Sequence, residues 1–172
     1  MKKSVIFVSM CSIVLTLCSY AFSQEYVTPV FDNRSWELGF SQNQGEVIFE
    51  EYVLVGESVE NWSELVSIQF FPGLQKTTNP DIFEAAMHRD LVLICPSVEW
   101  VSIYQSADER IWEWNIVNCQ GQPAQSEIAR LKVTDKGFHV WHYAIKEAPM
   151  SLEKKETWLE NLKKIQVVDA VK

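Results

Sequence analysis

The chain has 172 residues and a formal net charge of −8 at pH 7, from 15 basic and 23 acidic side chains. This length is typical of one domain with its own core. The negative charge repels the phosphate backbones of nucleic acids and anionic lipid headgroups. We therefore expect a single domain and no nucleic-acid partner. An acidic surface also keeps exported proteins soluble, so the charge by itself indicates no particular ligand.

The N-terminal segment has the composition of a secretory signal peptide. Lys2 and Lys3 precede an apolar run over residues 5–17, and small residues occupy positions −3 and −1 of a cut after Ser23. A cut after Ala21 fits nearly as well. The apolar run is shorter than the roughly 20 residues that a membrane-spanning helix needs. The segment therefore predicts export rather than anchoring.

A lipid-modified start is the alternative for this segment. Cys18 could become the first residue of a bacterial lipoprotein, but Leu17 precedes it where such signals have a small residue. We expect residues 1–23 to be removed instead. Residues 24–172 then form one domain in the bacterial periplasm or outside the cell, with no transmembrane segment.

Three segments of the first half predict strands, because apolar and β-prone residues alternate or run between turn residues. These are residues 35–41, 46–55 and 65–71. A turn at residues 42–45 joins the first two. We expect residues 59–64 to make a short helical turn capped by Ser58. The third strand ends at Pro72.

A helix is predicted to begin at Asn79. This residue caps the helix, Pro80 takes the first helical position, and Asp81 lies in the first turn. Apolar residues then recur at helical spacing and predict a stripe that packs on a sheet. The stripe consists of Ile82, Phe83, Ala86, Met87 and Leu91.

Cys95 and Cys119 are the only cysteines beyond the predicted signal peptide. Residues 97–105 and 109–118 between them predict a hairpin, and centring it on Ala107 places the two cysteines opposite each other. The same register pairs Val98 with Ile116, Trp100 with Trp114, and Ser102 with Trp112. In an oxidising compartment such a pair forms a disulfide. The alternative, a redox-active or metal-binding pair, lacks a Cys-x-x-Cys motif and a second ligand cluster.

Two further strands and a helix complete the chain. Residues 126–134 and 137–147 predict a strand pair around a turn at Asp135, Lys136 and Gly137, where glycine tolerates a positive φ. Ser151 is expected to cap a final amphipathic helix. Its apolar positions are Leu152, Trp158, Leu159, Leu162 and Ile165.

These elements predict an α+β domain, a mainly antiparallel sheet of about six to seven strands packed by two helices. The order of elements resembles the Mog1/PsbP-type fold. In that fold helices pack on an antiparallel sheet, and the chain ends with a helix that follows a long strand. The segment Gly56-Glu-Ser-Val-Glu-Asn-Trp-Ser-Glu-Leu-Val-Ser-Ile-Gln69 resembles a stretch of small exported bacterial proteins of unknown function. The resemblance implies an accessory or binding role, because proteins of that fold are mostly not enzymes.

No motif predicts catalysis, a metal site or a cofactor. His139 and His142 lie three residues apart in a predicted strand, so their side chains point to opposite faces. His88 lies near a helix end, where it is more often solvated than catalytic. The nucleophile elbow, the His-Glu-x-x-His helix and the phosphate-binding glycine loop do not occur in the sequence. We therefore expect no catalytic residue, no metal and no cofactor.

The chain is rich in tryptophan, with seven. Three of these, Trp100, Trp114 and Trp158, are expected in the core. Exposed tryptophans are common in binding surfaces. The candidate binding residues are Trp62, Glu64, Trp112 and Trp141. For Trp62 and Glu64 we favour structural roles, in which Trp62 holds a turn against the sheet and Glu64 caps backbone N–H groups.

Two functions from different classes agree with these patterns. The first is a non-catalytic exported protein that binds a protein of the cell envelope or exterior through a sheet face or edge. The second is a small secreted hydrolase that uses carboxylates or a histidine–acid pair. The absence of catalytic motifs and the surplus of aromatic residues favour the first.

Overall fold

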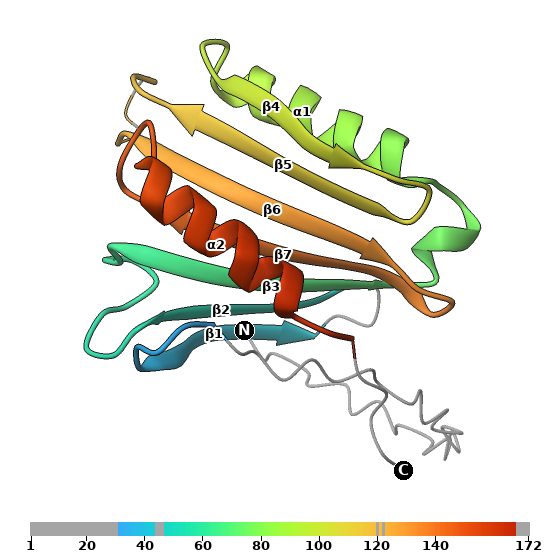
Figure 1. Cartoon of the computed structure of the whole chain (residues 1–172), viewed down its shortest axis with the longest axis horizontal. Helices are drawn as coiled ribbons and strands as arrows, with labels where there is room; N and C mark the ends of the chain where they lie inside the picture. The colour runs from blue at the N-terminus through green and yellow to red at the C-terminus, as the bar shows by residue number, and fades with distance from the viewer. Residues whose placement is uncertain (1–30, 44–46, 120, 122, 168–172) are drawn as a thin grey trace, which may run out of the picture.

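The computed structural model describes residues 31–43, 47–119, 121 and 123–167. The predicted signal peptide lies outside the described residues. Seven antiparallel strands form one sheet in the order β1-β2-β3-β7-β6-β5-β4, with α2 on one face and α1 on the other (Figure 1). The elements are β1 (Trp36–Asn43), β2 (Ile48–Leu54), β3 (Glu64–Pro72), a 3-10 turn η1 (Leu74–Lys76), α1 (Pro80–Ile94), β4 (Glu99–Gln105), β5 (Glu109–Ile116), β6 (Gln125–Val133), β7 (Gly137–Ile145) and α2 (Leu152–Lys164). The predicted α+β class is confirmed.

The centre of the sheet is the pairing of β3 with β7. It runs from Glu64 opposite Ile145 to Pro72 opposite Gly137. This pair joins a three-strand meander, β1 to β3, to a four-strand meander, β4 to β7. Every residue of β7 is buried, because the strand has neighbours on both sides and helices pack over the sheet. The core is therefore built around β7.

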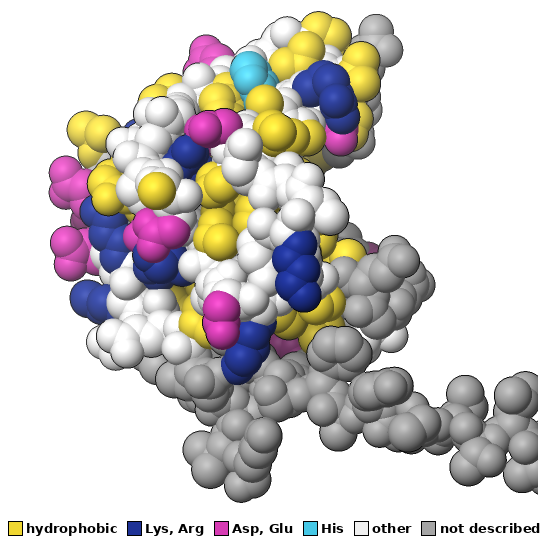
Figure 2. Space-filling model, turned by 90° about the vertical axis from the view of Figure 1, so that its right-hand side faces the viewer, with side chains coloured by type: hydrophobic (Ala, Val, Ile, Leu, Met, Phe, Trp, Pro, Cys, Tyr) yellow, Lys and Arg dark blue, Asp and Glu magenta, His cyan; other side chains and the backbone are white. Residues whose placement is uncertain are grey.

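The two helices pack on opposite sheet faces. On the α2 face, the Trp158 ring stacks on Tyr143 with centroids 3.8 Å apart. On the α1 face, the Phe83 ring contacts Phe71 at 5.3 Å and Phe138 at 5.7 Å. Successive side chains of a strand point to opposite faces of the sheet. Phe138 and Tyr143 are an odd number of residues apart on β7, so they face different helices. Figure 2 shows a hollow on one side of the molecule, which fits a face that a single helix covers only in part.

The predicted register of the β4–β5 hairpin is confirmed over most of its length. Trp100 pairs with Trp114, and Ser102 pairs with Trp112. A bulge between Ser102 and Tyr104 then shifts the pairing by one residue near the turn. Bulges of this kind increase the local twist of a strand.

The segment before β3 does not form the predicted helical turn. Ser58 and Asn61 instead form an isolated bridge that closes a tight turn, and the Ser58 Oγ accepts a hydrogen bond from the Asn61 N–H at 3.3 Å. Because β3 begins at Glu64, the chain must reverse direction within a few residues. A helix of even one full turn beyond the bridge does not fit in that space.

The turn between β6 and β7 uses its glycine differently from the prediction. The described glycines with a positive φ are Gly56, Gly73 and Gly121, and Gly137 is not among them. A Cβ at Gly137 would instead overlap the backbone oxygen of Phe71 on β3. Glycine is therefore required there by the close approach of two strands.

Both helices have an exposed apolar residue in their first turn, contrary to the predicted stripes. Ile82 is 58% exposed and Leu152 is 77% exposed. At about 100° per residue, Ile82 lies roughly 140° around α1 from Met87, and Leu152 lies roughly 120° around α2 from Trp158. Each side chain therefore points away from the face that packs on the sheet.

Candidate functional site

The β4 edge is an outer edge of the sheet, because β5 is the only neighbour of β4 among the strands that the structure describes. An outer strand leaves N–H and C=O groups unpaired on its free side. Val101 and Tyr104 are 49% and 48% exposed on this strand. Val101 pairs with Glu113 and Tyr104 with Ile111, whose side chains lie on the α2 face, so both exposed residues also lie on that face. The β4 edge thus combines free backbone groups with exposed apolar side chains.

A cavity of about 270 Å³ lies on the other face of β4, between this strand and α1. We call it the α1–β4 pocket. Its lining consists of Asp81, Glu84, Ala85, His88, Trp100 and Gln105. The His88 ring stacks on Trp100 with centroids 4.8 Å apart, and Trp100 stacks on Trp112 at 5.7 Å. The aromatic stack therefore fixes one wall of the pocket.

The charge of the pocket comes from two carboxylates that share one guanidinium. The buried Arg110 Nε lies 3.2 Å from Asp81 Oδ1 and 3.6 Å from Glu84 Oε2. Its Nη1 donates to the backbone oxygens of Ser106 and Glu109. Two negative charges against one positive charge leave the pocket net negative, so it suits a cation better than an anion.

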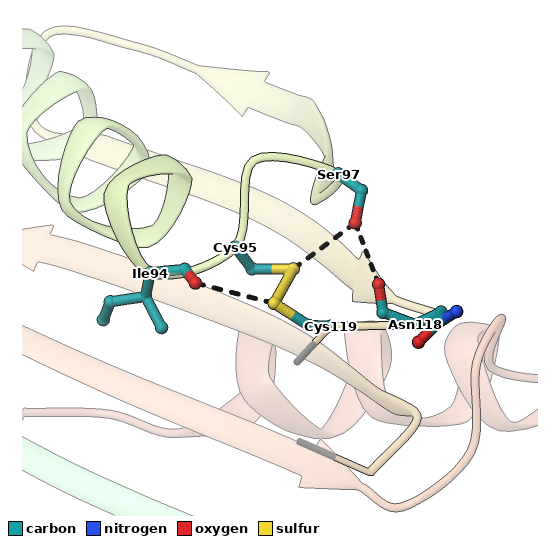
Figure 3. The surroundings of a disulfide bond; sticks show 5 residues. All are labelled: Ile94, Cys95, Ser97, Asn118 and Cys119. Atoms are coloured by element: carbon teal, nitrogen blue, oxygen red, sulfur yellow. Dashed lines mark hydrogen bonds between the residues drawn. A yellow bond between two sulfur atoms is a disulfide. The ribbon is translucent and has the colours of Figure 1, made fainter. Parts of the chain in front are cut away.

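The predicted disulfide joins Cys95, directly after α1, to Cys119, beyond β5 (Figure 3). The two Cα atoms are 5.7 Å apart, within the ordinary range for a disulfide. Ser97 Oγ, just before β4, donates to the Asn118 carbonyl oxygen at 3.0 Å. The covalent bond and this hydrogen bond hold the start of β4 against the end of β5.

Three exposed apolar side chains lie within two residues of the disulfide cysteines in the sequence. Leu93 is 77% exposed, Ile94 is 67% exposed and Val117 is 57% exposed. The disulfide therefore holds the end of α1, with Leu93 and Ile94, close to the end of β5, with Val117.

Glu64 lies at the centre of a hydrogen-bonded cluster on the α2 face. Its carboxylate accepts bonds from Arg34 Nη1 at 2.9 Å and Nη2 at 2.7 Å, from the Tyr143 hydroxyl at 2.6 Å, and from Lys154 Nζ at 2.9 Å. Burial alone would raise the pKa of Glu64, but these donors outweigh burial and lower the pKa to about 2. Burial, and after it the hydrogen bond to the same carboxylate, raises the pKa of Tyr143. The cluster thus connects Arg34, which precedes β1, and Lys154 of α2 to the central strands β3 and β7.

This arrangement corrects the predicted role of Glu64. The hydrogen bonds that the Glu64 carboxylate accepts come from the side chains of Arg34, Tyr143 and Lys154. The carboxylate that accepts a backbone N–H in this region is that of Glu57, 2.8 Å from the Ser63 nitrogen. A capping carboxylate needs free N–H groups within reach, and Glu64 is itself the first residue of a paired strand. The structural role that we favoured for Glu64 thus involves other partners.

Replacing Glu64 by glutamine is expected to lower the free energy of unfolding by about 2 kcal/mol at pH 6. This is less than the cost of breaking a fully buried pair, because Arg34 and Lys154 stay partly exposed. Because the pKa of Glu64 is lowered, its contribution is complete above pH 4.5 and disappears as the pH falls towards 2. Urea unfolding at pH 6, 4 and 2.5 measures the difference between the two proteins.

The matched control for this substitution is Glu160→Gln, which removes an exposed carboxylate of α2. Its effect should stay within about 0.5 kcal/mol at every pH. A Glu64→Gln deficit that stays constant down to pH 2.5 would contradict the lowered pKa.

His142 and Glu127 form a histidine–acid pair on the α1 face. The His142 Nδ1 lies 2.8 Å from Glu127 Oε1, and the Trp114 Nε1 donates to the same oxygen at 3.0 Å. Among the described residues, His142 Nε2 has no hydrogen-bond partner, and the atom is enclosed. A general base must reach its substrate through such a nitrogen. The pair is therefore oriented as in a hydrolase, but its free nitrogen is closed off from a substrate.

His139 and His142 lie on opposite faces of the sheet, as their spacing of three residues in one strand predicted. His139 stacks on Phe70 at 4.3 Å on the α2 face, whereas His142 lies at 6.5 Å from Trp112 on the α1 face. The part of the chain that the structure describes contains no group of three or more histidine, cysteine or acidic side chains suited to a metal ion.

A protein-family model matches residues 28–172. The chain belongs to this family, which is uncharacterised. No curated protein and no solved structure matches the chain, and the comparisons give the Mog1/PsbP resemblance no support. In the described part of this family member, no helix is long and apolar enough to cross a membrane.

The four predicted binding residues are scattered over the structure. Trp62 is half-buried, packs against a cluster of Val53, Leu65 and Ala144, and lies under Lys146 Nζ at 4.6 Å from its ring centroid. This position fits the structural role that we favoured. Trp112 and Trp141 are fully buried, so neither side chain reaches the surface.

Sequence reasoning missed the β4 edge and the α1–β4 pocket. Residues 97–105 were predicted as a strand, but the alternation of side chains does not tell an outer strand from an inner one. Asp81, Glu84 and His88 recur at helical spacing of three and four residues. That spacing indicates a shared helix face and was the one available signal for the pocket.

Proposed function

We propose that this chain is an exported, non-catalytic protein that binds another protein of the cell envelope or exterior through the β4 edge. The observation that carries the proposal is the half-exposure of Val101 and Tyr104 on an outer strand. Soluble proteins normally protect such edges with charges, proline or a covering element, because they pair readily with other chains. Strand β4 has a bulge between Ser102 and Tyr104 but still leaves Val101 and Tyr104 half-exposed, and an apolar outer edge is a common site for the addition of a partner strand.

The opposite edge of the sheet is the weaker candidate. Strand β1 also has exposed apolar residues, with Leu38 at 52% and Phe40 at 38%. The β4 edge has two further features: the pocket beside it and the disulfide that fixes its first residues. A rigid edge loses less conformational entropy on binding than a mobile one. We therefore assign the partner to β4.

Export is supported by two features. The predicted signal peptide would direct the chain out of the cytoplasm, and the Cys95–Cys119 bond suits an oxidising compartment. A signal peptide and a disulfide agree equally well with a protein that stays in the periplasm and with one that is secreted from the cell.

The test is affinity capture from envelope and culture-supernatant fractions with two edge variants. The double variant Val101→Lys and Tyr104→Lys places charges on the β4 edge and should reduce recovery of the partner at least tenfold. The matched control, Leu38→Lys, places a charge on the β1 edge and should leave recovery unchanged. Mass spectrometry with labelled standards measures the recovery.

Equal recovery by wild type and the β4 double variant would overturn the assignment to this edge. Loss of the partner in the Leu38→Lys control alone would move the interface to β1. Circular dichroism of each variant shows that the fold is retained.

A further inference from the structure

We infer that the partner segment is an extended strand that pairs with β4 and places a lysine or arginine side chain in the α1–β4 pocket. The inference rests on the proposed function and adds the chemistry of the partner. In the segment, apolar residues on one face alternate with the basic residue on the other.

The backbone of β4 determines how such a segment would lie. A strand added to an outer strand forms main-chain hydrogen bonds, and its side chains point alternately to the two faces of the sheet. On β4, one face carries Val101 and Tyr104, and the other borders the pocket through Trp100 and Gln105. The incoming strand therefore meets an apolar surface on one face and a cavity on the other.

The size of the pocket suits one side chain. Its volume of about 270 Å³ lies just below the roughly 300–1,000 Å³ of typical small-molecule sites. The aromatic rings of Trp100 and His88 stack on each other, so the wall that they form is already packed. One long side chain of an edge-bound strand fits this space better than a separate ligand.

The charges of the pocket select a basic side chain. Arg110 is 5% exposed and contacts Asp81 through Oδ1 in both of its hydrogen bonds, which leaves Oδ2 for a second cation. The Asp81 side chain is 72% exposed and can therefore reach an incoming group. Glu84 is buried in the lining and adds a second negative charge. An acidic side chain in the same place would meet two carboxylates and be repelled.

The charge of the whole chain acts in the same direction. A net charge of −8 attracts cationic segments and raises their rate of association at low salt. Apolar residues alone would bind the edge without discrimination between partners. The basic side chain supplies the specificity.

The experiment uses three synthetic peptides and the purified protein. The first is acetyl-Gly-Val-Lys-Val-Ser-Val-Gly-amide, and the other two replace its lysine by glutamine or glutamate. Isothermal titration calorimetry at low salt measures each dissociation constant. We expect the lysine peptide to bind at least tenfold more tightly than the glutamate peptide, with the glutamine peptide between them.

Two variants of α1 locate the effect. Asp81→Asn should reduce the preference for lysine over glutamine at least threefold, and Asp81→Glu should restore it. Asp90→Asn is the matched control, because it removes an exposed carboxylate from the same helix outside the pocket lining. It should leave the preference unchanged.

The outcomes separate this inference from the proposed function. If all three peptides bind equally, or Asp81→Asn does not change the preference, the pocket does not select a basic side chain and the inference fails. The proposed function fails only if the β4 double variant still recovers the partner. Absence of binding by every peptide also overturns the inference.

Discussion

Trp158→Ala is expected to lower the free energy of unfolding by about 3–5 kcal/mol, the usual cost of removing a buried tryptophan. Trp158 is 2% exposed and stacks face to face on Tyr143. Its edge also contacts the Trp36 ring at a centroid distance of 5.9 Å. Removal of the indole therefore leaves a cavity between α2, β7 and β1. Urea unfolding followed by far-UV circular dichroism measures the loss.

Leu152→Ala is the matched control on the same helix. Leu152 is 77% exposed, so its truncation should change the free energy of unfolding by less than about 0.5 kcal/mol. A loss below 1 kcal/mol for Trp158→Ala would show that α2 does not pack on the sheet through this residue. The pair of variants thus tests the docking of α2.

The double variant Cys95→Ser and Cys119→Ser is expected to lose about 3 kcal/mol of stability. The bond spans a sequence separation of 24 residues, and the chain-entropy model gives this value for a loop of that length. Cys95 is fully buried among aromatic residues, so serine adds the cost of a buried hydroxyl. Unfolding curves of the wild type with and without dithiothreitol measure the effect without any substitution.

The double variant also serves as the control for the reductant. Its unfolding midpoint should be the same with and without dithiothreitol, whereas that of the wild type should fall. A wild-type midpoint that does not respond to the reductant would contradict a stabilising disulfide. Affinity capture with the double variant also measures how far partner binding depends on a fixed β4 edge.

Local sequence signals predicted the elements of this fold well. The cap at Asn79 accepts the Ile82 N–H at 3.0 Å, as its position before Pro80 predicted. The register of the β4–β5 hairpin followed from the turn and from the two cysteines. Such features depend on residues that are close in sequence, or on one covalent bond, and the chemistry of those residues is enough to define them.

Long-range pairing was not predictable in the same way. The periodicity of side chains shows that β3 and β7 are strands, but it does not show which strands pair with each other. The pairing of β3 with β7 therefore could not be predicted. The same holds for Glu64, whose partners Arg34, Tyr143 and Lys154 lie 30, 79 and 90 residues away in the sequence. The candidate site at β4 depends on strand order as well. It therefore became visible only with the structure.

The junction of β3 with β7 has a consequence for the order in which the protein folds. Phe71 and Phe138 are partners in this junction, although they lie 67 residues apart in the sequence. The first three strands therefore wait, with an open apolar edge on β3, until β7 has been synthesised. Exposed strand edges in incomplete chains promote aggregation. A chain with this topology gains from being kept unfolded until its last strand is available.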